Sequence, residues 1–209
     1  MRDLNEIIAE EKRKTKEARE RVAVFLRSIG SQDAQMIHSS FAAIENDYYK
    51  GGGYSAAFLG VLRVPLISDL AKATFVDIWI QHGAHIRQET RNQIALFNAL
   101  PKLLPRYNGR DEITIFRGEG ALNRKRRSYG ASWSSDIEVA DSFARDYWRD
   151  HTGGSVLLRT VVPPEAIIFM TNEAGESEYV VDRRKLKRIE VIRRYPELSW
   201  DKASQEAAH

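Results

Sequence analysis

Apolar residues in the first half of the chain recur at steps of three and four. Leu4, Ile7 and Ile8 begin this pattern, and Lys, Arg and Glu fill the positions between the apolar ones. Such spacing places the apolar side chains on one face of an α-helix. Gly30 predicts the end of the first helix, and Ser31 or Asp33 is a suitable cap for the next one.

Further helices are predicted up to about residue 104. The glycines at 51–53 indicate a turn, and Ser55 is expected to cap the helix that follows. Residues 74–83 place Phe75, Ile78 and Trp79 on one stripe, and residues 87–104 continue in helical register as far as Pro101 and Pro105. Four or five helices are therefore expected in this half.

After a turn-rich stretch at 106–112, short runs of β-branched and aromatic residues replace the helical pattern. Such runs are typical of strands. They lie at residues 113–116, 155–162, 166–170, 178–181 and 188–194. Between them, residues 136–150 place Val139, Phe143 and Tyr147 at four-residue steps, which predicts an amphipathic helix capped by Ser135 or Asp136.

The two patterns predict an α+β fold. Residues 1–105 form a helical N-terminal segment that packs on or covers the second part, residues 106–200 form the strand-rich core, and residues 201–209 form a polar tail. With 43% hydrophobic and 29% charged residues, the composition is that of a globular protein.

Composition excludes several kinds of site. The chain has no cysteine, so thiol catalysis and thiolate metal sites are excluded, and its five histidines show no ligand spacing; no metal is expected. The first 20 residues lack the apolar core of a secretory signal, and residues 56–80 are too often interrupted by charge to span a membrane. The sequence predicts a cytoplasmic protein without membrane contact, or one delivered into a target cell by a non-classical route.

Three short stretches in the strand-rich half carry candidate chemistry. "FRG" places Arg117 at the end of the first predicted strand, followed by Gly118; an arginine there can present its planar fork to a phosphate, and a glycine lets a ligand approach the backbone. "SWSS" places Ser132 and Ser134 on one side of a short strand, where hydroxyls can hold a carboxylate.

The third stretch, "GESEYVV" at 175–181, contains two glutamates one residue apart. In an extended segment Glu176 and Glu178 face the same side, about 6.5 to 7 Å apart. A solvated edge strand would explain the pair, and so would ion pairing with the basic run that follows. The alternative is a working pair in which one carboxylate stabilises a developing cation and the other aligns a nucleophile.

In this order, "FRG", "SWSSDIEVA" and "GESEYVV" resemble the Arg-Ser-Glu class of mono-ADP-ribosyltransferases, a family of bacterial toxins, effectors and vertebrate ecto-enzymes. The resemblance covers residues 113–194. It implies a split β-sandwich with an NAD cleft, in which the nicotinamide glycosidic bond is cleaved and ADP-ribose passes to an acceptor. An inhibitory antitoxin or immunity protein is an implied partner.

Site roles follow from the resemblance residue by residue. Arg117 is expected to bind a phosphate of NAD, and Gly118 to contact nicotinamide or its ribose. Ser132 is expected to position the catalytic Glu178, with Ser134 nearby, while Glu176 orients or deprotonates the acceptor. Phe143 or Trp133 could stack on nicotinamide, although an aromatic residue on a helix stripe is more often part of the core. Trp133 replaces the family's usual threonine and is expected to point into packing.

The acceptor has two candidate identities. The Glu-x-Glu form resembles enzymes that modify protein arginine, which is the first expectation. The second is RNA or DNA, attracted by two basic runs that could flank one cleft: Arg124, Lys125, Arg126 and Arg127, and Arg183, Arg184, Lys185, Lys187 and Arg188. A partner-binding module without catalytic activity is the alternative from another functional class.

Overall fold

The structure is a computed structural model, and it describes residues 3–45, 52–147, 151–172 and 177–198. The chain divides into two compact units, Met1–Pro105 and Arg106–His209. In the described parts, the structure confirms the α+β class: the first unit is helical and the second contains a six-stranded antiparallel sheet.

Five helices make up the described part of the first unit. They are α1 (Leu4–Ser28), α2 (Ala34–Glu45), α3 (Gly52–Val61), α4 (Asp69–Glu89) and α5 (Gln93–Leu103). Asp33 caps α2, since its Oδ1 accepts a hydrogen bond from Met36 N at 2.9 Å. Ser55 is not a cap, because α3 already begins at Gly52; its hydroxyl instead accepts a hydrogen bond from Asn92 N at 3.0 Å.

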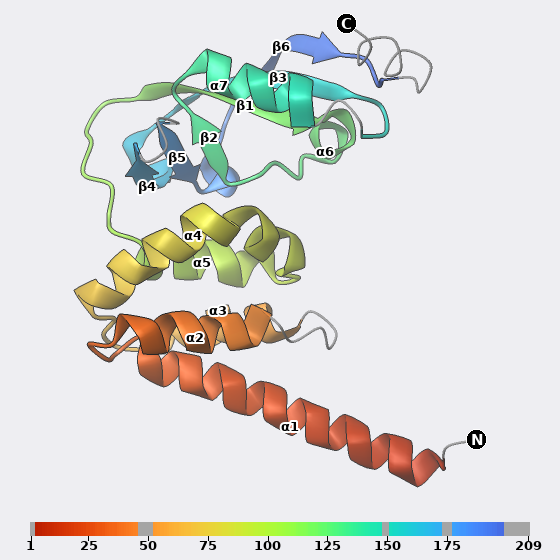
Figure 1. The fold of residues 1–209 in the computed structure, drawn as a ribbon. Helices are drawn as coiled ribbons and strands as arrows, with labels where there is room; N and C mark the ends of the chain where they lie inside the picture. The colour runs from red at the N-terminus through yellow and green to blue at the C-terminus, as the bar shows by residue number, and fades with distance from the viewer. Residues whose placement is uncertain (1–2, 46–51, 148–150, 173–176, 199–209) are drawn as a thin grey trace, which may run out of the picture. The chain divides into compact units, whose positions relative to one another are not determined.

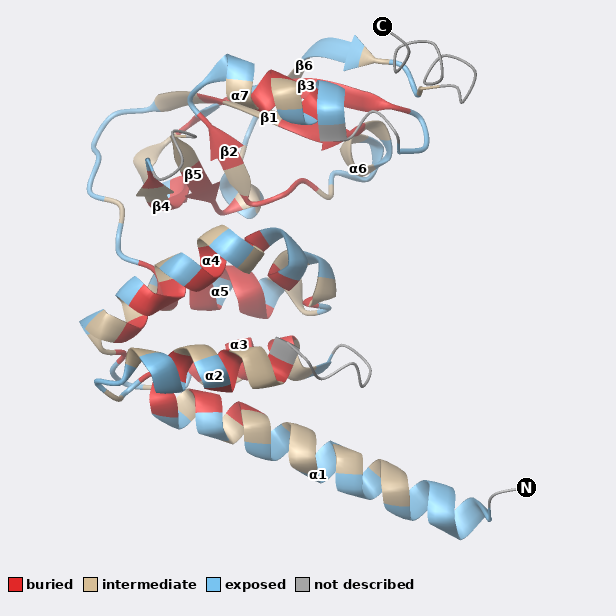
Figure 2. Cartoon of the chain, viewed as in Figure 1, coloured by how far each residue is buried: buried red, intermediate tan, exposed pale blue. Residues whose placement is uncertain are grey.

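The helical pattern of residues 87–104 is interrupted by a turn. Helix α4 ends at Glu89, and Asn92 caps α5 by accepting a hydrogen bond from Ala95 N at 3.0 Å. A cluster of aromatic rings fills the core of this unit, with Phe41 in edge contact with both Phe25 and Phe75. The first half of α1 contributes little to this core, as the exposed surface of the helix in Figure 2 shows.

Six strands form the sheet of the second unit. They are β1 (Ile113–Gly120), β2 (Ser132–Ser134), β3 (Ser155–Val162), β4 (Ile167–Thr171), β5 (Glu178–Val181) and β6 (Ile189–Tyr195), in the spatial order β4-β5-β2-β1-β3-β6. The four later runs predicted from the sequence agree with the observed strands to within one residue at each end. Strand β1 is longer than predicted, so Arg117 lies inside the strand and not at its end.

The two faces of the sheet have different partners. Side chains from β1, β2, β3, β4 and β5 meet in one buried cluster on the first face, so the sheet curves around this core. The second face carries helix α7 (Ile137–Ser142), which continues as one turn of π-helix over Phe143–Tyr147 and packs on β1 (Figure 1). Helix α6 (Ala121–Arg126) follows β1, and short 3-10 turns occupy Pro164–Ala166 and Arg183–Lys185.

The two central strands of the sheet, β1 and β2, pair with each other over a short stretch. Strand β1 pairs with β3 along eight residues, from Ile113 opposite Val162 to Gly120 opposite Ser155. Its ladder with β2 on the other side has one register pair, Phe116 opposite Ser134. In the described residues, the sheet therefore consists of two three-stranded ladders that join at this pair.

Candidate active site

Glu178 is the first residue of β5 and lies in the middle of a row of polar side chains. Across the ladders, Ser134 of β2 is opposite Glu178 on one side, and Thr171 of β4 is opposite it on the other. Directly opposed residues of antiparallel strands point to the same face and have Cβ atoms about 4.5 to 5.5 Å apart. The half-buried carboxylate is thus placed between two mostly buried hydroxyl side chains.

The serine directly opposite Glu178 is Ser134 and not Ser132, the serine that the resemblance expects to position Glu178. Ser132 lies opposite Val180, two positions further along the ladder. The Oγ of Ser134 accepts a hydrogen bond from Asp136 N at 3.0 Å. A hydroxyl has one donor and two acceptor positions, so Ser134 can also donate to a carboxylate.

Glu176 lies outside the described residues, and its neighbour Ser177 is a corner of the chain. Ser177 has a φ of 42°, in the left-handed region, and β5 begins only at the next residue. Extended backbone is described from Glu178 onward, and the predicted spacing between Glu176 and Glu178 lies outside the described residues. The carbonyl of Ser177 accepts a hydrogen bond from Ser135 N at 3.3 Å, which ties this corner to the end of β2.

Helix α7 lies on the same face as Glu178. Ser134 is opposite Phe116 in β1, and Phe116 packs against Ala140 and Ala144 of the helical segment. Gly118, also on this face, lets the helix come close: a Cβ built there would lie 2.3 Å from Ala144 N and 2.5 Å from Ala140 O. Gly118 therefore has a packing role that the sequence prediction did not include.

The two candidate stacking residues occupy opposite environments. Trp133 is 2% exposed in the sheet core and donates from Nε1 to Gly130 O at 3.2 Å, which confirms that it points into packing and excludes it as a stacking residue. Phe143 is 43% exposed, contrary to the expectation that an aromatic on this stripe is core. The buried stripe of the helix is formed instead by Ala140, Asp141 and Ala144.

Asp141 fixes the helix to the edge strand β6. Its carboxylate is 3% exposed, accepts a hydrogen bond from the Tyr195 hydroxyl at 2.6 Å, and accepts another from Arg193 Nη1 at 2.9 Å. Burial and this hydrogen bond to Asp141 raise the pKa of Tyr195, so the phenol stays protonated as a donor. The contact holds the segment that carries Phe143.

Arg117 is engaged inside the fold. Its Nε donates to Glu119 Oε2 at 2.8 Å and its Nη1 donates to Ser132 O at 2.5 Å. A Cβ on Gly130 would lie 2.1 Å from Nη2, so the guanidinium packs directly against that glycine. Arg117 thus links β1 to the start of β2 where the two strands have parted. Its predicted contact with a phosphate of NAD stays a prediction.

Glu119, which none of the three sequence motifs contains, is the buried partner of Arg117. It is fully buried and also accepts hydrogen bonds from Gly130 N at 3.0 Å and Asn123 Nδ2 at 2.8 Å. Burial favours a higher pKa, but the charge of Arg117 and these hydrogen bonds outweigh it, so the pKa of Glu119 is lowered. The alternation Arg117-x-Glu119, with both side chains on one face of a strand, is the signal that could have identified it.

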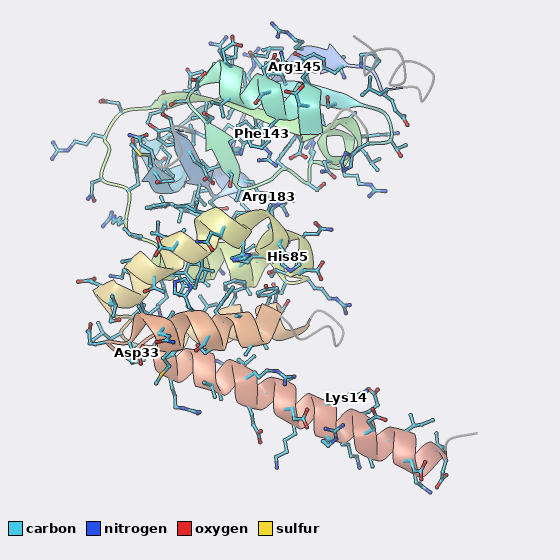
Figure 3. The ribbon with its side chains drawn as sticks, in the orientation of Figure 1. Lys14, Asp33, His85, Phe143, Arg145 and Arg183 are labelled. Carbon is cyan, nitrogen blue, oxygen red and sulfur yellow. The ribbon has the colours of Figure 1, made fainter. Side chains whose placement is uncertain are left out.

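Both basic runs reach the same residue, Tyr129. The guanidinium of Arg124 lies 6.0 Å from the centre of the Tyr129 ring, and Arg183 Nη1 donates to Tyr129 O at 2.9 Å. Figure 3 labels Arg183 close to the start of β2. Burial lowers the pKa of Arg183, although the negative charge of Glu119 acts to raise it.

Other site types find no support in the described part of the chain. No group of three or more His, Asp or Glu side chains there could hold a metal ion. None of the described helices combines the length and apolar character of a membrane span. Compared with protein-family models, with curated proteins and with solved structures, the chain finds no match in any of the three.

Proposed function

We propose that the second unit is the catalytic unit of an NAD-dependent mono-ADP-ribosyltransferase with the split β-sandwich of that family. The observation that supports this most is the position of Glu178. Its carboxylate lies between Ser134 and Thr171, on the sheet face that also carries Gly118 and helix α7. The site thus has one half-buried carboxylate with hydroxyl neighbours, beside the place where β1 and β2 part.

This arrangement suits cleavage of the nicotinamide glycosidic bond. When the bond between C1′ of the ribose and the nicotinamide nitrogen breaks, the electron pair leaves with nicotinamide, and positive charge develops on C1′ and the ring oxygen. Glu178 would stabilise that charge and accept a hydrogen bond from the ribose 2′-hydroxyl. A fixed carboxylate with little surrounding water stabilises such a cation strongly.

The neighbouring residues would position the reactants. Ser134 would donate its hydroxyl proton to the Glu178 carboxylate and hold its rotamer. Phe143, an exposed residue of the helical segment that covers this face of the sheet, would stack on nicotinamide. Arg117 would contribute to the site indirectly, because its hydrogen bond to Ser132 O joins β1 to the start of β2.

Transfer is completed by a nucleophile of a macromolecular acceptor. Its lone pair forms the new bond to C1′, and its proton leaves to a base, a role for which Glu176 is the candidate from the family resemblance. Without an acceptor, water would take this place and the protein would hydrolyse NAD slowly. As in members of the family that the sequence resembles, the activity would serve a toxin or an effector.

The test is release of nicotinamide from NAD by the purified 209-residue chain. Glu178→Gln should lower the rate by about a hundredfold or more, because it removes the stabilising charge while keeping the shape of the side chain. Glu112→Gln is the matched control, since Glu112 is exposed ahead of β1. Equal turnover by wild type and Glu178→Gln would exclude the proposal, and a partner-binding module would then be the better interpretation.

A further inference from the structure

We infer that the acceptor is a nucleic acid, bound through its phosphates by a basic surface at one end of the sheet. This inference rests on the proposed transferase function. The basic surface is defined by nine residues: Arg124, Lys125, Arg126, Arg127, Arg183, Arg184, Lys185, Lys187 and Arg188. Seven of them are exposed, and Arg124 and Arg183 are half-buried.

Topology brings the two basic runs to the same end of the sheet. Strands β1 and β5 are each antiparallel to β2, so they run in the same direction and their C-terminal ends lie together. Residues 124–127 follow β1 through helix α6, and residues 183–188 follow β5 directly. Tyr129 joins them, with Arg124 near its ring and Arg183 bonded to its carbonyl.

Much of this positive charge has no ion-pair partner among the residues that the structure describes. Arg184 pairs with Asp182 at 2.7 Å, and Arg188 pairs with Glu190 at 3.0 Å. Within the described ranges, Lys125, Arg126, Arg127 and Lys187 take part in no ion pair. Concentrated charge of one sign opposes folding by self-repulsion, and a polyanion with regularly spaced phosphates relieves it.

The same geometry disfavours a protein arginine as the acceptor. A basic surface repels a cationic guanidinium, whereas it attracts a phosphate backbone. Asp182, next to the second run, is about 13 Å from Glu178 along β5, which a polymer of several nucleotides can bridge.

Binding can be measured without NAD, so that it does not depend on catalysis. The probes are fluorescein-labelled single strands of RNA and of DNA with one sequence of about 20 nucleotides, titrated by anisotropy at about 50 and about 200 mM salt. The surface variant is Lys125→Gln, Arg126→Gln and Lys187→Gln together. The matched control, with the same loss of charge, is Lys12→Gln, Lys16→Gln and Arg19→Gln on the exposed part of α1.

We expect the surface variant to weaken binding of at least one probe by about tenfold at low salt and to reduce the salt slope by about 2, while the control binds like wild type. Equal binding by all three proteins would overturn the inference. Competition by poly-glutamate as effective as that by unlabelled RNA or DNA would also overturn it, and would point to an acidic protein partner.

Transfer from radiolabelled NAD then identifies the acceptor. In a lysate, label that survives protease and is removed by ribonuclease or deoxyribonuclease supports a nucleic-acid acceptor and tells RNA from DNA. Label removed by protease overturns the inference and leaves the transferase proposal intact. If wild type releases no nicotinamide, the transferase proposal fails and the acceptor role fails with it, whatever the binding result.

Discussion

Ser134 lies directly opposite Glu178 in the ladder between β2 and β5, and Ser132 lies opposite Val180. We therefore expect Ser134→Ala to lower kcat for nicotinamide release by about tenfold to a hundredfold, because a hydrogen bond to a charged group contributes about 1.5 to 3 kcal/mol. Ser132→Ala should change kcat less than threefold or so. Steady-state kinetics of both variants, with thermal melting as a check on folding, would decide. A larger loss for Ser132→Ala would contradict the observed register.

Gly118→Ala should destabilise the second unit. The added methyl group would approach two backbone atoms, Ala144 N and Ala140 O, that cannot rotate away. We expect a loss of about 1 to 3 kcal/mol in the free energy of unfolding, as for other overpacked sites. Gly52→Ala is the control, because a Cβ there meets nothing within 4 Å. Urea denaturation gives both values, and equal stability of the two variants would show that helix α7 does not pack this closely.

The pair of Arg117 and Glu119 makes stability depend on pH. Because the pKa of Glu119 is lowered in the folded state, its contribution is fully present above its unfolded pKa of about 4.3 and is lost as the pH falls through the folded pKa. Glu119→Gln should cost about 3 to 5 kcal/mol at pH 7, since it leaves Arg117 without its carboxylate.

Urea titrations at a series of acidic pH values measure this dependence. The difference in unfolding free energy between wild type and Glu119→Gln should shrink as the pH falls below about 4. Glu112→Gln, at an exposed position, should follow wild type throughout. A difference that does not vary with pH would mean that the ionised form of Glu119 is not the stabilising one.

Phe143→Ala should affect NAD binding more than folding. The ring is 43% exposed, so its removal should cost less than about 1 kcal/mol of stability. Loss of a stacking contact should raise KM for NAD by about three- to tenfold, and Phe143→Tyr should restore it. Ile137→Ala is the control on the same helix, at 38% exposure. An unchanged KM would remove Phe143 from the proposed site.

Local patterns predicted most of the elements because the periodicity of each segment reflects the face that it buries. The strands β3 and β5 begin and end where the runs of β-branched residues do. Strand β1 was predicted too short because "RGEG" has the composition of a turn. Those residues stay extended for two reasons. Arg117 and Glu119 form an ion pair on one face of the strand, and Gly118 leaves room for helix α7 on the other face.

The details of the site depend on long-range register, which a single sequence does not specify. A shift of two residues between β2 and β5 would have placed Ser132 opposite Glu178 without altering which faces are buried. The buried face of the helix predicted over residues 136–150 was assigned wrongly for a related reason. Its large apolar residues follow a helical stripe, yet the helix lies so close to Gly118 that alanines form the contact.

The junction at Phe116 and Ser134 has a mechanical consequence. In most sheets the central strands are the most rigid part and their amide protons exchange slowest with solvent. Here a single backbone register pair, helped by the side chain of Arg117, couples one three-stranded ladder to the other. The backbone ladder of the sheet is therefore weakest between β1 and β2, and we expect amide protons there to exchange faster than those in the eight-residue ladder between β1 and β3.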